Sequence, residues 1–388
     1  MNEEVEQLTM RKSPLDETHR QSGAIFAERD GFMLPANYGG DARAEYEAVR
    51  GAGDAGLIDL SSVRSRIEVS GAEAVQFLNG LITNDMKTLA AGAWMPAAFP
   101  NVQGRLLAHV RVMRPTEAIS FLFDTETATH EKVFQILARF TLAGDFRVRD
   151  VSHETAQLSL QGAKSPDIIE EVLGRSAAQT ERGRVSVVSW GDDDHPVTIA
   201  RATHTGEDGY DLFIAADAAA ALWQALTQAG ARPIGFEAFE ILRVEAGVPR
   251  YGVDVSDTNV VPEAGQDEAV SYTKGCYIGQ EIIARIHWRG HVAKRLAGLV
   301  LEDERQLAAD AKVISTEGKE IGRVTSAVRS PRLARTVALG IIRYDYLQPG
   351  TPVTIVSGEE SHAAHIAELP FVRGSWYTAQ VGGEETNQ

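Results

Sequence analysis

The sequence predicts an α+β fold followed by a separate all-β region, and three observations support this prediction. Up to about residue 292, strand-like and helix-like segments are mixed without the strict alternation of a doubly wound sheet. After residue 292, short strand-like segments are separated by turns such as Glu317-Gly318 and Pro349-Gly350, which is typical of a small antiparallel barrel or sandwich. The length of 388 residues is enough for two or three domains.

The individual elements follow from the period of the apolar residues, which is about 3.6 in helices and about 2 in strands. Helices are predicted at residues 43–51, 72–81, 131–140, 166–173, 218–229, 235–247 and 280–286. Strands before the boundary are predicted at residues 55–60, 64–69, 105–112, 119–123, 156–161, 185–190, 197–202 and 211–215. Strands after the boundary are predicted at residues 297–301, 311–315, 320–326, 336–342 and 352–356. Residues 1–22 and 379–388 are polar, and we expect both to be disordered tails.

The composition excludes several classes of partner and site. The formal net charge is −16, so we expect neither nucleic acid nor an anionic membrane surface as a partner. The first residues are acidic and polar, and the apolar runs are too short to span a bilayer, which predicts a cytoplasmic protein. The single cysteine, Cys276, permits no internal disulfide and cannot hold a metal alone, and the histidines form no ligand motif, so no metal site is expected.

The most distinctive segment is residues 274–281, which read Lys-Gly-Cys-Tyr-Ile-Gly-Gln-Glu and lead into a predicted helix. Lys274 and a helix N-terminus are both able to lower the pKa of the Cys276 thiol and so make it reactive. The alternative is a buried, inert cysteine in a turn, which is common for a free thiol. Residue chemistry alone leaves both interpretations open.

Two charged residues in other segments are candidates for ligand binding. Glu207 lies in residues 205–211, where Asp-Gly is typical of a hairpin turn, but its carboxylate also suits a heterocycle with adjacent ring N–H and amino groups. Arg243 lies on the predicted helix 235–247, where it either pairs with a carboxylate such as Glu240 or Glu245 or points at an anionic ligand. The turn and the ion pair are the simpler interpretations.

Two further segments give weaker signals. Asn84 lies in residues 79–85, where an asparagine either caps a turn or bonds a ligand. Residues 51–56 match the G-x-G-x-x-G pattern of dinucleotide-binding loops. That site needs a strand before the glycines and a helix after them, and the order here is reversed, so we interpret the segment as a helix stop and turn.

These segments occur together in one protein superfamily. Residues 32–378 resemble the aminomethyltransferase, or T-protein, of the glycine cleavage system and its folate-binding relatives. The matching segments are residues 55–61, 77–85, 205–211, 242–247, 322–326, 330–333 and 338–340. The resemblance implies a three-domain arrangement around a central folate channel. Residues 23–291 would form two interleaved α+β domains, and residues 292–378 would form the C-terminal antiparallel β-barrel.

Two departures from the T-protein pattern bear on activity. The T-protein has an aspartate tied to methylene transfer, but the matching residues 103–109 contain no carboxylate, and His109 is only a loose candidate to replace it. The octapeptide 274–281 is instead similar to the signature of YgfZ-type folate proteins, which assist the maturation of iron–sulfur enzymes. Whether the chain is an enzyme therefore stays open at this point.

The resemblance assigns roles to six residues. Tetrahydrofolate, or a one-carbon-substituted folate, would be bound by Glu207, Arg243, Asn84 and Tyr251. The expected catalytic residues are Cys276 and Lys274, near the mouth of the channel. The basic residues 285–295 would meet the glutamyl tail of the folate or an acidic partner.

Three functions are compatible with these residues. The first is a tetrahydrofolate-binding protein that assists assembly or repair of iron–sulfur enzymes through Cys276, with iron–sulfur client or assembly proteins as partners. The alternative is a folate-dependent aminomethyltransferase or another one-carbon transferase of T-protein type, against which the missing aspartate counts. The third is a plain folate-binding module in which Cys276 is inert.

Overall fold

The computed structural model describes residues 12–29, 31–305, 307–308 and 310–378. Residues 1–11 and 379–388, which were expected to be tails, lie outside the described residues. The expectation of disorder is wrong for residues 12–22, which contain helix α1 (Asp16–Gln21). Leu15 is fully buried in a hydrophobic core, and His19 Nε2 lies 2.9 Å from Asp59 Oδ2. These two contacts hold a segment that looks featureless by composition.

Two antiparallel β-sheets form the larger part of the molecule. The first has five strands in the order β5-β6-β7-β4-β8 and the second has six in the order β10-β11-β12-β9-β3-β13, where only the short β13 pairs in parallel. The strands of the first sheet are β4 (Arg64–Ser70), β5 (Ala93–Pro100), β6 (Leu106–Arg114), β7 (Ser120–Glu126) and β8 (Arg147–Asp150). Those of the second are β3 (Gly56–Asp59), β9 (Thr155–Gln161), β10 (Val185–Trp190), β11 (His195–Arg201), β12 (Gly209–Ala215) and β13 (Arg232–Pro233). Strand β3 belongs to the six-stranded sheet, and β4, which follows it in the chain, belongs to the five-stranded sheet. The chain therefore interleaves the two sheets.

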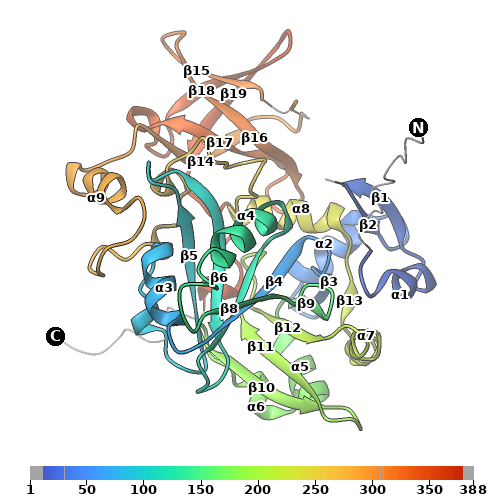
Figure 1. Cartoon of the computed structure of the whole chain (residues 1–388). Coiled ribbons are helices and arrows are strands. Elements are labelled where there is room, and N and C mark those ends of the chain that lie inside the picture. The colour runs from blue at the N-terminus through green and yellow to red at the C-terminus, as the bar shows by residue number, and fades with distance from the viewer. Residues whose placement is uncertain (1–11, 30, 306, 309, 379–388) are drawn as a thin grey trace, which may run out of the picture.

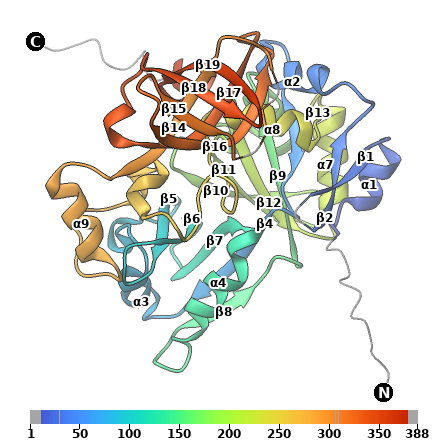
Figure 2. The same ribbon diagram turned by 90° about the horizontal axis from the view of Figure 1, so that it is seen from above.

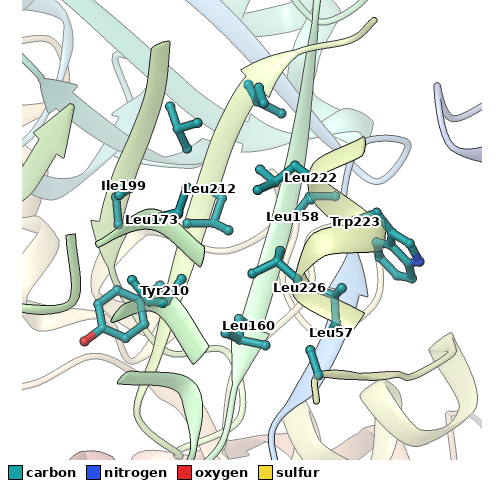
Figure 3. Close-up of a cluster of buried hydrophobic side chains, with 14 of the residues drawn as sticks. Leu57, Leu158, Leu160, Leu173, Ile199, Tyr210, Leu212, Leu222, Trp223 and Leu226 are labelled. Atoms are coloured by element: carbon teal, nitrogen blue, oxygen red, sulfur yellow. The ribbon is translucent and has the colours of Figure 1, made fainter. Parts of the chain in front are cut away.

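Each sheet is covered on one face by helices that bury a core. The six-stranded sheet packs against α5 (Ser165–Leu173) and α7 (Ala219–Gln228), whose Leu173 and Leu222 share one core with Leu158 and Leu212 of the strands (Figure 3). The five-stranded sheet packs against α3 (Ala74–Leu81) and α4 (Thr127–Ala138). The helices predicted from apolar periodicity are the ones that form these layers, because the same stripe that reveals a helix must be buried.

The C-terminal region is a closed antiparallel barrel of six strands in the order β14-β17-β16-β15-β18-β19. Its strands are β14 (Lys294–Leu301), β15 (Lys312–Ser315), β16 (Glu320–Ser330), β17 (Arg335–Arg343), β18 (Pro352–Ser357) and β19 (Glu360–Ala367). Of the two predicted architectures, the structure shows the barrel. The barrel lies at one end of the molecule and the six-stranded sheet at the other (Figure 1). Closure removes the unpaired strand edges that a sandwich would leave.

The remaining elements lie outside the two sheets and the barrel. They are the hairpin β1 (Ile25–Arg29) and β2 (Phe32–Asn37), and the helices α2 (Ala42–Arg50), α6 (Arg175–Ala178), α8 (Phe236–Glu245), α9 (Gln280–Arg289) and α10 (Ser375–Thr378). Short 3₁₀ helices span Met86–Thr88, Val261–Ala264, Asp267–Ala269 and Tyr344–Tyr346. Helix α8 contacts α2, β2, β16 and β17, so it joins the sheets to the barrel. Helix α9 lies at the edge of the molecule in both views (Figures 1 and 2).

Candidate functional site

A cavity of about 430 Å³ lies where the N-terminal hairpin, α4, α8 and the loop 248–253 meet. Its apolar wall contains Phe32, Phe236, Phe239 and Tyr251. The rings of Phe236 and Phe239 pack edge to face, with centroids 5.6 Å apart and planes at 87°. Aromatic walls with a few polar groups are typical of sites that bind flat organic ligands.

Charged residues form the second wall of the cavity. Arg29 Nη2 lies 2.7 Å from Glu240 Oε2, and Arg243 pairs with the same carboxylate. Burial works to raise the pKa of Glu240, but Arg243, Arg29 and Arg250 outweigh it and hold that pKa at about 2. Glu240 is therefore an anion at neutral pH and fixes the guanidinium groups around it.

Arg243 lines the cavity, but its donors are used within the protein. Its guanidinium donates to Glu240, to Asp254 Oδ2 at 2.7 Å, to the carbonyl of Val248 at 3.0 Å and to Ser326 Oγ at 2.7 Å. All five N–H groups are accounted for. The ion pair with Glu240 that the sequence suggested is present, and Arg243 holds α8, the loop after it and the barrel together.

Among the described carboxylates that line the cavity, Glu126 is the one that is neither paired with an arginine nor exposed. It is the last residue of β7, it is half-buried, and both its oxygens accept the backbone N–H of Tyr251 at 3.1 and 3.0 Å. Burial raises the pKa of Glu126, and nearby Arg64 only partly offsets this effect. A carboxyl group with a raised pKa beside a cavity is suited to give and take protons.

A buried network of charges lies behind the cavity and ties the two sheets together. His204 lines the cavity, and its Nε2 lies 2.9 Å from Asp211 Oδ2. Arg111 bridges Asp211 of β12 and Asp124 of β7, and Arg64 pairs with Asp124. Burial opposes ionisation of Asp211, but His204 and Arg111 outweigh it and hold its pKa well below the usual range. The network fixes the floor of the cavity.

Glu207 lies outside the cavity lining. Its Oε1 accepts Arg50 Nη1 at 2.8 Å, and its Oε2 accepts the backbone N–H and the hydroxyl of Ser375, both at 2.7 Å. Arg50 also pairs with the fully buried Glu245 at 2.8 Å. The structure thus places Glu207 in a contact between α2, the turn before β12 and the C-terminal end of the described chain.

Asn84, Lys274 and Cys276 also lie outside the cavity lining. Asn84 Nδ2 donates to the carbonyls of Pro96 at 2.8 Å and Glu268 at 3.0 Å, so its side chain joins two loops. Lys274 Nζ donates to the carbonyls of residues 79, 82 and 84 at 2.7, 3.0 and 2.6 Å, and burial lowers its pKa to about 8. Cys276 is exposed, which contradicts the interpretation of a buried thiol.

Of the six residues assigned from the resemblance, the structure brings two, Arg243 and Tyr251, to one cavity. The roles of all six in binding or catalysis stay predictions. Glu126, His204 and the arginines at positions 29, 64 and 250 also line the cavity but were not among the predicted site residues. No local motif marks them, because they come from segments far apart in the chain.

Residues 103–109, the segment that lacks the expected aspartate, run into strand β6. Leu106 and Ala108 of β6 are fully buried, and both ring nitrogens of His109 are buried without a partner among the described residues. Burial lowers the pKa of His109 to about 4, so the ring is neutral at neutral pH. His109 is absent from the cavity lining, which gives no support to its replacing the aspartate.

Two family models together cover most of the chain. The GCVT N-terminal domain matches residues 15–274, and the glycine cleavage T-protein C-terminal barrel domain matches residues 294–373. The chain belongs to the glycine cleavage T-protein family. The predicted α+β T-protein architecture with its C-terminal barrel is thereby confirmed.

Relatives in this T-protein family span nearly the whole chain. A protein of Rubrobacter xylanophilus named aminomethyltransferase is 32% identical over 368 residues, which cover 94% of this chain and 95% of that protein. An aminomethyltransferase of Geobacillus kaustophilus is 31% identical over 375 residues, which cover 94% and 99%. The solved structure of glycine cleavage system aminomethyltransferase T from Bartonella henselae has the same fold, with a TM-score of 0.84 at 24% identity over 94% of this chain and 99% of that one.

These relatives correct the main functional prediction. The expectation that Cys276 serves assembly or repair of iron–sulfur enzymes, with iron–sulfur proteins as partners, is wrong, because full-length relatives are named aminomethyltransferases. That prediction relied on the octapeptide 274–281. In the structure residues 274–279 form a loop and residues 280–281 begin α9. The lysine is bonded to backbone carbonyls, and the cysteine lies outside the cavity lining.

The structure also bears on metals and membranes. Within the described ranges, no three His, Cys, Asp or Glu side chains are placed to hold a metal ion. No helix in the described part of the chain is long and apolar enough to cross a bilayer.

Proposed function

We propose that this protein is a folate-dependent one-carbon transferase of the aminomethyltransferase type. The observation that carries the proposal is the cavity, which combines aromatic walls, fixed arginines and a carboxyl group with a raised pKa. The names of the full-length relatives support the same activity. A cytoplasmic location and membership of the YgfZ-type subfamily remain predictions.

The residues of the cavity fit the chemistry of a reduced folate. A pteridine ring is flat and matches the space beside Phe32, Phe236 and Phe239. Its ring N–H and amino groups are donors, and Glu126 and Glu131 offer acceptor oxygens. The glutamate end of a folate carries carboxylates, which match the guanidinium groups of Arg29 and Arg64 in the lining, since Arg243 has all its N–H groups bonded within the protein. A bound tetrahydrofolate supplies the nitrogen atoms that accept or release the one-carbon unit.

Glu126 is the residue that we assign to proton transfer. Its raised pKa brings it closer to neutral pH, where an acid or base works best. Its bonds to the Tyr251 N–H fix the direction of its carboxyl group. Glu126 thus supplies a carboxyl group to a fold whose strand β6 lacks the aspartate expected there.

The proposal is tested by measuring binding and turnover on the full chain. Purified protein is titrated with tetrahydrofolate in a calorimeter, and then incubated with tetrahydrofolate and an aminomethyl donor while 5,10-methylene-tetrahydrofolate is quantified. We expect saturable binding and methylene-folate formation that depends on protein concentration. Binding without any turnover, for several aminomethyl and methyl donors, would reduce the protein to a folate-binding module.

A further inference from the structure

A second, smaller cavity adjoins the first and has a different chemistry. Its volume is about 180 Å³, and it shares Phe32, Arg64 and Thr127 with the larger cavity. Six of its eleven lining residues carry a hydroxyl group, two are Lys12 and Arg64, and none is acidic. In a chain with a net charge of −16, a polar pocket without a carboxylate among its described lining residues is a local exception.

One buried polar atom in this pocket has no hydrogen-bond partner among the described residues. Ser62 lies in the loop between β3 and β4 and is 8% exposed. Its hydroxyl oxygen is buried and makes no hydrogen bond to a described residue, while its carbonyl accepts Thr127 Oγ1 at 3.0 Å. Leaving a buried hydroxyl unpaired is unfavourable, so a group in the pocket is expected to bond it.

Arg64 and Lys12, the two cationic side chains of the pocket, each have N–H donors that no described residue uses. Arg64 uses Nε and Nη2 on Asp124, but its Nη1 makes no hydrogen bond to any residue that the structure describes. Lys12 forms no ion pair with a residue in the described ranges, although it lines the pocket. A guanidinium, an ammonium and a hydroxyl group together are a donor set that matches the oxygens of a carboxylate or phosphate.

From this arrangement we infer that the pocket formed by Ser62, Arg64, Lys12 and their neighbours binds an oxyanion. The oxyanion is either a carboxylate of the molecule that fills the larger cavity or a separate small anion beside it. The assignment stands on the pocket itself and holds whether or not the larger cavity takes a folate. The alternative occupant of a small polar cavity is water alone.

The test measures the thermal unfolding midpoint of the full chain against inorganic phosphate and against acetate, at constant ionic strength set with chloride. We expect a saturable rise of the midpoint with at least one of the two anions, because a ligand that binds the folded state stabilises it. Ser62→Ala is expected to weaken the apparent anion affinity about tenfold, the effect of losing a hydrogen bond to a charged group.

Ser165→Ala is the matched control for Ser62→Ala. Ser165 is fully buried, its hydroxyl group, like that of Ser62, has no partner among the described residues, and it lines neither cavity. Lys12→Gln tests the pocket without touching a buried residue, and Lys319→Gln on the barrel is its control. We expect weaker anion binding in the two pocket variants and unchanged binding in the two controls.

A titration of tetrahydrofolate with and without phosphate then separates the two sources of the oxyanion. Competition means that the pocket takes a carboxylate of the same ligand, and independent binding means that it takes a separate anion. The inference is overturned if neither anion raises the midpoint beyond the chloride control. It is equally overturned if Ser62→Ala and Ser165→Ala bind the anion alike, since the pocket then holds water only.

Discussion

Ser375 donates both its backbone N–H and its hydroxyl group to one carboxylate oxygen of Glu207, each at 2.7 Å. The other oxygen of Glu207 accepts Arg50 at 2.8 Å. Gly374 packs so closely on the Glu207 carboxylate that a Cβ at this position would clash with it. Residues 205–211, for which the sequence left a hairpin turn and a ligand site open, therefore fix the C-terminal end of the described chain to the six-stranded sheet.

We predict that Glu207→Ala destabilises the protein by about 2–3 kcal/mol, because Arg50 Nη1 and Ser375 lose their charged hydrogen-bond partner while Arg50 keeps its ion pair with Glu245. The free energy of unfolding in urea measures this effect. Glu281→Ala, at an exposed position on α9, is the control and should change stability little. Normal stability with weakened folate binding would show instead that Glu207 contacts the pterin, as the resemblance implied.

Glu126→Gln is predicted to lower the rate of one-carbon transfer by about 10²–10⁴-fold, because the amide cannot exchange a proton at this position. Folate affinity should fall much less, since the amide keeps one acceptor oxygen for the Tyr251 N–H. Single-turnover kinetics and a binding titration separate the two effects. Glu171→Gln, at an exposed position of α5 outside both cavity linings, is the control. Equal rates for both variants would remove Glu126 from the chemistry.

His109 gives a prediction about pH. Its pKa is lowered to about 4 by burial, so between about pH 6.5 and pH 4 the unfolded chain binds a proton that the folded chain does not. Burying the neutral ring therefore costs no free energy of unfolding above the unfolded-state pKa of about 6.5. As the pH falls below that value, the free energy of unfolding decreases. The loss from pH 7 to pH 5 is about 2 kcal/mol for this one group.

His109→Leu should remove that part of the acid sensitivity. Urea unfolding at pH 7 and pH 5 would show a smaller drop in the variant than in the wild type. His287→Leu, at an exposed position of α9, should keep the wild-type drop. An identical pH dependence for His109→Leu and the wild type would mean that the His109 ring is protonated in the folded state.

Cys276 is predicted to be modified readily in the native protein, because its side chain is exposed. Cys276→Ser should leave methylene-folate formation within about twofold of wild type, since the residue lies outside the cavity lining. Thiol titration without denaturant and the turnover assay check the two statements. A large loss of turnover in Cys276→Ser would place the thiol in the reaction.

The parts of the fold that could be predicted are those with a clear period. Residues 131–140 lie within or beside α4, and the predicted barrel strands match five of the six observed ones. Strand β5 was missed because Pro96 and Pro100 interrupt its pattern, and prolines argue against strands. Helix α1 was missed because its own residues are polar. The apolar residue that packs into the core, Leu15, lies just before the helix.

The site was harder to predict than the fold. Arg243 and Tyr251 were named because they lie in a recognisable segment, but Glu126 reaches the cavity from the end of β7 and His204 from the loop between β11 and β12. Their position depends on how two sheets, a hairpin and the barrel pack, which no local pattern encodes. The resemblance located the correct family, whereas a single eight-residue motif led to the wrong function within it.

The most direct test of the central claim is calorimetric titration of the full chain with tetrahydrofolate, in the wild type and in Phe239→Ala. Phe239 belongs to the aromatic wall of the larger cavity, far in sequence from the octapeptide 274–281. The account predicts saturable binding to the wild type and an affinity at least about tenfold weaker in the variant, because an aromatic contact is lost. Absence of binding to the folded wild type, or equal affinity in the two proteins, would contradict the claim that this cavity is a folate site.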